Sequence, residues 1–443
     1  MPQGYALLLH LLHRAAKGCK MNSIRKNAAK AALLSILLIA CATAAVYAEQ
    51  LHSPTWGYYI DIPEGFELSA KQGKENYQFV HSLFPATLVI QSWKKGRYAN
   101  TEEAVKTSLQ KLKASGDIEK IHWRSNECAL SLFDMQLAGV SYRGWAACTP
   151  LEANKGLTLL LCYCPSQNFE ALQQLIVSAI DAFSPDAGAL HEIGILTSYA
   201  YPKQGDMPVT LKIGGKNIQT AIDSSDIEAS EFVIEREYAV LKAFASSPLW
   251  KKAWQRYYRM VYRDSYKRLE KTAFCVYNAL GTSSTENTGA GKNGAENIGK
   301  TGTGSDSGTG NSGSGSAKAQ DNADRALTQT LLSWVQNFPY EREQNSSDFT
   351  ALPAILTGKA SDCDSRALLL AVLMSHMNYK TMMFVSAEYS HALFGIDIPG
   401  KGARLEENGI RYLLGETTGK VDIGLVPQDM SDTSKWIAIS GLF

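Results

Sequence analysis

The sequence SDCDSRALLLAVLM, residues 361–374, predicts a helix that starts at a polar cap and continues as an apolar run. Either Ser361 or Asp362 can cap it, which places Cys363 in the first turn. A thiol in that turn lies near unpaired backbone N–H groups, which favour the thiolate and can hold an oxyanion. Asp362 and Asp364 oppose the thiolate by like charge, so a nucleophilic Cys363 needs a nearby base.

The residues after this helix offer a base and a carboxylate. Apolar and alternating runs predict strands over 379–386, 393–398 and 409–414. His391 precedes the second strand and Glu416 follows the third, so neighbouring antiparallel strands would bring the two side chains together. The helix that carries Cys363 would pack against this sheet. Thiol, imidazole and carboxylate then form a nucleophile, a general base and a group that orients the base.

This arrangement resembles the transglutaminase-like, papain-related superfamily. Residues 362–367 are similar to its G-D-C-x-x-x-A element, His391-Ala392 to its His-Ala strand, and residues 416–418 to its acid-x-Thr strand end. The match runs from about Leu327 to Thr418. The resemblance implies a Cys-His-acid triad of Cys363, His391 and Glu416 that acts on a protein or peptide substrate through a thioester. It implies no metal or organic cofactor.

Two positions depart from the family pattern, and a third has two readings. Glu416 is one methylene longer than the usual Asp, and Ser361 replaces the Gly often found two residues before the cysteine. Gln336 is either an oxyanion-hole donor, as in papain-like enzymes, or a surface residue of a helix over 324–338. Such domains also occur as catalytically silent binding or scaffolding modules, which is the alternative to an acyl-transfer enzyme.

Residues 49–187 predict a separate α+β domain. Helices are expected over 101–115 and 167–183, and strands over 55–62, 77–80, 86–93, 129–134, 138–147 and 157–164. The unit resembles the PsbP-like α/β/α sandwich at Gly57, Tyr58, Pro63, Gly65, Phe66 and Phe183. That resemblance is a statement about fold and implies no particular function.

Four cysteines cluster in this domain: Cys128, Cys148, Cys162 and Cys164. One or two disulfides within the cluster are one interpretation, and small buried apolar residues are the other. Cys162 and Cys164 face the same side of a strand and are not expected to pair with each other. A zinc site is disfavoured because the cluster has no CxxC pair.

The segment 188–280 predicts a hairpin over 208–223 and then helices that break near Ser246-Ser247-Pro248, all within the catalytic domain. An apolar stripe over 250–280 is expected to face the core. The eight basic residues between Lys251 and Lys271 are expected on the solvated face, and a surface for anionic lipid or polyanions is the other reading.

The low-complexity segment 281–317 predicts a disordered insertion into that domain, whose core is residues 318–443. The chain contains 44 Lys and Arg against 43 Asp and Glu, a net charge of +1, which argues against a nucleic-acid-binding protein.

The first 48 residues carry six basic residues and no acidic one, followed within that stretch by an apolar run and small residues. This pattern predicts a secretory signal cleaved before Glu49, with Met21 as an alternative start. The residues that end at Cys41 also resemble a lipobox, in which Cys41 is lipidated. Both readings predict an exported protein in the periplasm or cell envelope, held at the membrane only through a lipid on Cys41.

Overall fold

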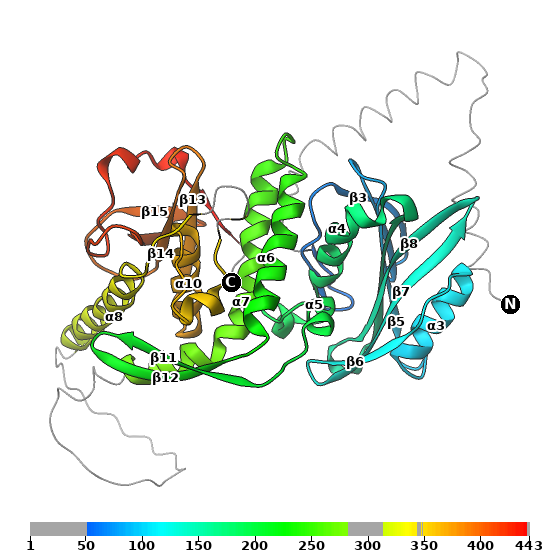
Figure 1. The fold of residues 1–443 in the computed structure, drawn as a ribbon, viewed down its shortest axis with the longest axis horizontal. Helices are drawn as coiled ribbons and strands as arrows, with labels where there is room; N and C mark the ends of the chain where they lie inside the picture. Colours follow the sequence, from blue (N-terminus) through cyan, green and yellow to red (C-terminus); the bar gives the residue numbers. More distant parts are fainter. Residues whose placement is uncertain (1–50, 282–312, 343–346, 348, 441–443) are drawn as a thin grey trace, which may run out of the picture. The chain divides into compact units, whose positions relative to one another are not determined.

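The computed structural model describes residues 51–281, 313–342, 347 and 349–440 (Figure 1). The expected signal segment, including Cys41, and most of the expected insertion 281–317 lie outside the described residues. In the described ranges the strands form four sheets, each with antiparallel pairing, together with helices. The mixed α and β class predicted from the sequence is confirmed. Among these residues, no helix is both long and apolar enough to span a bilayer.

The largest sheet has seven strands, and helices cover both of its faces. Its strands are β3 (Phe66–Gln72), β4 (Asn76–His81), β5 (Thr87–Lys94), β6 (Glu119–Trp123), β7 (Asn126–Leu137), β8 (Val140–Pro150) and β9 (Gly156–Pro165). Their order is β3-β4-β5-β9-β8-β7-β6. β3 and β6, the two edge strands, were not predicted from the sequence. They are largely exposed, and each carries only a short apolar alternation, Phe66-Leu68-Ala70 in β3 and Ile121-Trp123 in β6.

Alternate side chains of the central strand β9 pack against two different helices. Leu159 and Leu161 belong to a core cluster with α3 (Thr101–Leu112), while Leu160 and Cys162 belong to one with α4 (Phe169–Asp181). Successive side chains of a strand point to opposite faces, so the helices lie on opposite sides of the sheet. Because β9 is buried on both faces, it carries a nearly continuous apolar run.

The four clustered cysteines of this sheet are free thiols in the structure. All four are fully buried, and Cys162 and Cys164 share one core cluster, which agrees with the expected common face. Cys148 lies in the cluster on the other face. Burial raises the pKa of each of these thiols, so they are protonated and act as small apolar residues.

The remaining strands and α-helices of residues 51–281 are a three-stranded sheet, a short helix, a hairpin and two longer helices. They are β1 (Leu51–His52), β2 (Tyr59–Ile60), β10 (Phe183–Ser184), α5 (Ile195–Ala200), the hairpin β11 (Asp206–Ile213) and β12 (Lys216–Asp223), and the helices α6 (Asp226–Lys242) and α7 (Trp250–Gly281). Gly214 and Gly215 form the hairpin turn with φ of 55° and 78°, a conformation that glycine adopts without strain. The predicted break between the two helices is confirmed.

The expectation that the basic residues of α7 face solvent is wrong for four arginines. Arg256, Arg259, Arg263 and Arg268 are each at most 7% exposed. α7 contacts α6, α10 and β12 on several sides, so few of its positions remain open to water. The expected apolar stripe is present beside them, with Tyr258, Val261, Leu269, Ala273 and Val276 buried.

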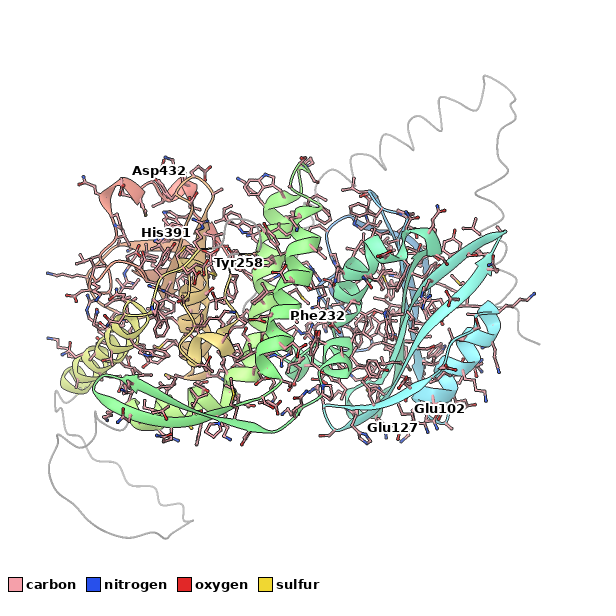
Figure 2. The ribbon with its side chains drawn as sticks, viewed as in Figure 1. Glu102, Glu127, Phe232, Tyr258, His391 and Asp432 are labelled. Atoms are coloured by element: carbon pink, nitrogen blue, oxygen red, sulfur yellow. The ribbon has the colours of Figure 1, made fainter. Side chains whose placement is uncertain are left out.

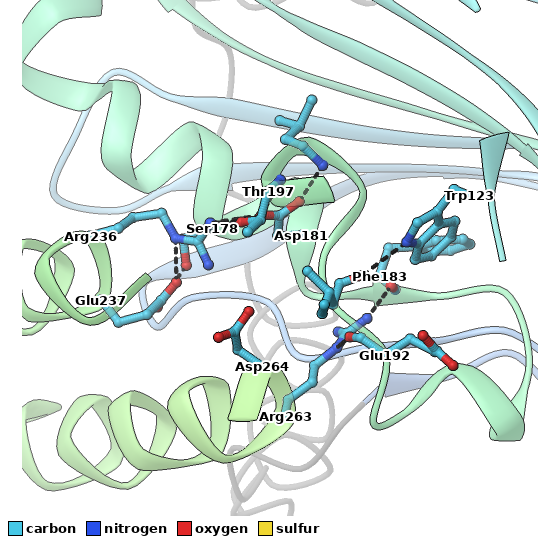
Figure 3. Close-up of polar contacts among 12 residues, drawn as sticks. Trp123, Ser178, Asp181, Phe183, Glu192, Thr197, Arg236, Glu237, Arg263 and Asp264 are labelled. Carbon is cyan, nitrogen blue, oxygen red and sulfur yellow. Dashed lines mark hydrogen bonds and ion pairs between the residues drawn. The ribbon is translucent and has the colours of Figure 1, made fainter. Parts of the chain in front are cut away.

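Buried acceptors satisfy these arginines. Arg259 Nε lies 2.7 Å from Asp61 Oδ2, and Arg256 Nη1 lies 2.8 Å from Glu237 Oε2. Arg263 donates to the carbonyl of Phe183 at 2.7 Å, as Figure 3 shows. Arg236 on α6 pairs with Asp181 on α4 at 2.7 Å in the same view. Buried charges are tolerated only when they are paired and hydrogen-bonded in this way.

The C-terminal part places a helix on a five-stranded sheet. Its elements are α8 (Gly313–Val335), α9 (Leu352–Leu356), α10 (Cys363–His376), β13 (Thr381–Ser386), β14 (His391–Ile396), β15 (Arg404–Glu407), β16 (Ile410–Gly415) and β17 (Ile437–Ala438), with sheet order β15-β16-β14-β13-β17. α10 packs on β13 and β14 and also contacts α7. α8 starts at Gly313, inside the segment expected to be disordered, because the alanine-rich stretch that follows has high helix propensity.

Candidate active site

Cys363 is the first residue of α10. Asp362 is the N-cap, and its Oδ1 accepts a hydrogen bond from the backbone N–H of Ser365 at 2.9 Å. Of the two cap residues expected from the sequence, the structure selects Asp362. The thiol receives a hydrogen bond from the backbone N–H of Ala392, at the start of β14. Cys363 is only 2% exposed.

His391 and Glu416 form a direct pair. β14 and β16 are antiparallel neighbours with Phe394 opposite Gly415, so His391 and Glu416 stand at the same end of the two strands (Figure 2 labels His391). Nε2 of His391 lies 2.7 Å from Oε2 of Glu416. The side chain of Glu416 therefore reaches the imidazole across the ends of the two strands.

The carboxylate of Glu416 is fixed on its other oxygen. Oε1 accepts hydrogen bonds from the backbone N–H and the hydroxyl of Thr418, at 2.7 and 2.5 Å, and from the N–H of Gly419 at 3.2 Å. Burial opposes ionisation of Glu416, but the hydrogen bonds from His391 and Thr418 outweigh it and lower the pKa to about 2. Glu416 is therefore charged at neutral pH.

This pair sets the roles of the two imidazole nitrogens. A charged carboxylate only accepts hydrogen bonds, so Nε2 of His391 carries the hydrogen and Nδ1 of the neutral ring is an acceptor. The thiol of Cys363 lies against the backbone of Ala392, the residue next to His391. The structure thus brings Cys363, His391 and Glu416 to one place at the junction of α10, β14 and β16.

The electrostatics of Cys363 do not favour a resting thiolate. Burial, and then the charges of Asp364 and Asp362, raise the pKa of the thiol well above its usual range. Sγ lies 3.3 Å from Oδ1 of Asp364 and donates to it. The helix start does not outweigh these effects, which agrees with the expected opposition from Asp362 and Asp364, and Cys363 is a protonated thiol in this structure.

Gln336 is neither the oxyanion donor nor the surface helix residue that the sequence suggested. It follows α8 and is only 6% exposed, so it is not a surface residue. Its side-chain nitrogen donates to the carbonyls of Glu416 at 2.8 Å and Val421 at 2.9 Å. Both amide hydrogens are used there, so Gln336 holds the segment that carries Glu416 and has no donor left for an oxyanion.

Arg366 is a buried residue of the site that the sequence analysis did not single out. Its guanidinium donates to the carbonyl of Phe338 at 2.9 Å, to the carbonyl of Thr417 at 3.2 Å and to the hydroxyl of Ser361 at 3.0 Å. It therefore ties the start of α10 to the segment after α8 and to the segment after β16. A polar residue inside an otherwise apolar helix was the signal available for it.

Aromatic side chains line the surroundings of the thiol and imidazole. The ring of Trp436 lies edge-on to His391 at 6.5 Å and contacts Tyr389 at 5.5 Å. Tyr340 is half exposed and stacks on the guanidinium of Arg366 at 5.3 Å. A groove of about 410 Å³ lies elsewhere, between the β11–β12 turn and α8, and includes Lys212 and Trp334 in its lining. It includes no residue of the predicted triad.

One group within the described ranges meets the distance requirement of a metal site. The ligand atoms of Asp362, Cys363 and Asp364 lie within 4.8 Å of one another. Hydrogen bonds from Ser365, Cys363 and Tyr258 already engage oxygens of the two carboxylates. We therefore assign no metal to them.

Comparisons with known proteins place this chain in no family. No family model and no curated protein matches it. Similar solved structures include cyanobacterial PsbP (CyanoP) from Synechocystis sp. PCC 6803, with 13% identity, a TM-score of 0.27, and coverage of 32% of this chain and 96% of that chain. The Saccharomyces cerevisiae Ran-binding protein Mog1p has 10% identity, a TM-score of 0.25 and coverage of 32% and 96%.

A third similar structure is LpqN, involved in cell envelope biogenesis of Mycobacterium tuberculosis. It has 11% identity, a TM-score of 0.24, and coverage of 31% of this chain and 88% of that chain. TM-scores at this level carry no inference about the site or the activity of this chain.

Proposed function

We propose that this chain is a cysteine-dependent acyl-transfer enzyme that uses Cys363, His391 and Glu416. The observation that carries the proposal is the pair between Nε2 of His391 and the charged carboxylate of Glu416, beside the thiol at the start of α10. A carboxylate held by Thr418 and Gly419 fixes one imidazole tautomer and stabilises the imidazolium that forms during proton transfer. A purely structural histidine does not need a partner that is fixed in this way.

The proposed reaction has two steps. Sγ of Cys363 attacks an amide carbonyl while Nδ1 of His391 takes the thiol proton, and the leaving amine then takes that proton as the C–N bond breaks. Water attacks the resulting thioester, which releases the acid and restores the thiol. Because Gln336 and the N–H of Ser365 are engaged, the N–H of Cys363 at the start of α10 is the donor best placed to meet the oxyanion.

Hydrolysis of a protein or peptide is the proposed outcome, and transfer to an amine is the second. The two differ only in the group that resolves the thioester. A C-terminal transglutaminase-like domain and an N-terminal PsbP-like sandwich, with boundaries near 187 and 318, belong to the same proposal. We also propose export, by a cleaved signal or by a lipid on Cys41, to the periplasm or cell envelope.

A catalytically silent binding module is the second candidate. It is favoured by the 2% exposure of Cys363 and by the thiol hydrogen that Asp364 accepts. In that case, the apolar surroundings of Trp436 and Tyr340 would hold a partner without chemistry.

The two candidates are separated by incubation with a peptide library and a fluorescent primary amine, read by mass spectrometry. An enzyme releases shortened peptides or attaches the amine, and Cys363→Ala abolishes both reactions. A silent module leaves the library unchanged.

A further inference from the structure

Asp364 lies between two hydrogen-bond donors from different elements. Its Oδ1 accepts from Sγ of Cys363 at 3.3 Å, within the first turn of α10. Its Oδ2 accepts a short hydrogen bond from the hydroxyl of Tyr258 on α7. The triad described above uses neither Asp364 nor Tyr258.

Tyr258 is a rigid donor for this carboxylate. It is 2% exposed and contacts the rings of Tyr257 at 4.9 Å and Phe349 at 6.4 Å (Figure 2 labels Tyr258). Burial, and then the charge of Asp364, raise the pKa of its phenol well above the usual range, so it remains a donor across the physiological range. A buried phenol with one short hydrogen bond fixes the direction of the carboxylate that accepts it.

The position of the carboxylate decides where the thiol hydrogen points. In this structure the hydrogen goes to Asp364, whereas acyl transfer requires it to go to Nδ1 of His391. Rotation about the Cα–Cβ and Cβ–Sγ bonds of Cys363 redirects the thiol hydrogen away from Asp364, and it needs no further reactant. The resting thiol and the reactive thiol therefore differ in their acceptor.

We infer that Tyr258 and Asp364 are a pair of positioning residues that hold the Cys363 thiol in a resting state, with its hydrogen directed to Asp364 instead of His391. The inference rests on the proposed function for its meaning in catalysis. The hydrogen-bond arrangement itself is testable without turnover. Titratable and charged groups from several elements surround the thiol. At the helix start they are the N-cap Asp362 and, on α10, Asp364 and Arg366. The other elements contribute Tyr258 on α7, Tyr340 after α8, His391 on β14 and Glu416 after β16.

The test measures alkylation of Cys363 by iodoacetamide as a function of pH, read by peptide mass spectrometry. The variants are Asp364→Asn, Tyr258→Phe and the double variant, in the full chain. Tyr262→Phe is the matched control, because Tyr262 is a buried tyrosine one turn further along α7. Labelling of the partly exposed Cys275 in the same digest corrects for reagent and time.

We expect the half-labelling pH of Cys363 to fall by at least about one unit in Asp364→Asn, which is about tenfold more thiolate at a given pH. Tyr258→Phe should shift it in the same direction by less, and Tyr262→Phe should leave it unchanged. In the double variant, Tyr258→Phe should add nothing to Asp364→Asn, because the phenol acts only through that carboxylate.

An unchanged profile in Asp364→Asn, or a Tyr258→Phe profile equal to that of Tyr262→Phe, overturns the inference. If Asp364→Asn does not fold, as judged by circular dichroism, the isosteric Tyr258→Phe decides alone. A shifted profile without any acyl transfer by the wild type keeps the resting-state pair and overturns the proposed function. Acyl transfer by the wild type with unshifted labelling profiles in the variants supports the proposed function and overturns the resting-state pair.

Discussion

Nε2 of His391 lies 2.7 Å from Oε2 of Glu416, although 25 residues separate them in the sequence. The contact depends on the antiparallel pairing of β14 with β16, which brings both strand ends to the first turn of α10. Gln336 and Arg366 hold the segment after β16 from two other sides. Loss of the His391–Glu416 hydrogen bond should therefore change the free energy of unfolding as well as the reactivity of Cys363.

Glu416→Gln should change the pH dependence of stability. The pKa of Glu416 is lowered from 4.5 to about 2 in the folded chain, so its charge stabilises the fold fully above the unfolded pKa and loses that effect as the pH falls through 2. The wild type should exceed the variant by on the order of 3 kcal/mol above about pH 5 and by little near pH 2. Urea unfolding across pH 2–7 measures this, and a difference that does not depend on pH would contradict it.

Gln336→Met should reduce stability more than it reduces any catalytic rate. The change leaves the buried carbonyls of Glu416 and Val421 without a donor, which costs about 1–3 kcal/mol. An oxyanion donor would behave in the opposite way, with a rate loss of about 10²–10³ and little change in stability. Thermal melts and acyl-transfer rates on the same samples separate the two roles.

Arg259→Met should be strongly destabilising, by about 3–5 kcal/mol, because buried Asp61 loses its partner at 2.7 Å and keeps only Arg256, whose Nε lies 3.8 Å from its Oδ1. Lys271→Met is the matched control on the same helix, since its pair with Asp206 is exposed and should be worth less than about 1 kcal/mol. The double variant Asp61→Asn with Arg259→Met should recover part of the loss. Equal losses of unfolding free energy in Arg259→Met and Lys271→Met would contradict the claim that burial makes the Arg259–Asp61 pair the more important one for stability.

The cysteines of the large sheet should be reduced in the native protein. Denaturation without reductant, followed by alkylation, should label Cys128, Cys148, Cys162 and Cys164 fully, because the structure has them as buried free thiols. Peptide mass spectrometry reads the outcome. Labelling of any of the four that requires prior dithiothreitol would mean that the disulfide interpretation is the correct one.

The sequence predicted most regular elements because their signals are local. The continuous apolar run of β9, the glycine pair of the β11–β12 turn and the polar cap before α10 each depend on a few adjacent residues. The edge strands β3 and β6 were missed because their apolar alternation spans only two or three apolar residues in largely exposed strands.

The errors concern features that only packing decides. The charges between Lys251 and Lys271 look like a solvated face, yet Arg259 is buried because Asp61, 198 residues away, meets it in the fold. Gln336 was interpreted as either an oxyanion donor or a surface helix residue, whereas in the structure it is buried and uses both of its amide hydrogens on backbone carbonyls. The hydrogen bond from Tyr258 to Asp364 joins residues 106 apart, which no local pattern reveals.

The measurement that tests the central claim most directly is acylation of Cys363 by p-nitrophenyl acetate, followed by p-nitrophenol release and by peptide mass spectrometry. We predict a burst of about one p-nitrophenol per chain, an acetyl group on Cys363, and a rate that falls by roughly 10²–10⁴ in His391→Ala. Acetylation of Cys363 that is absent, or equally fast in His391→Ala, would contradict the account.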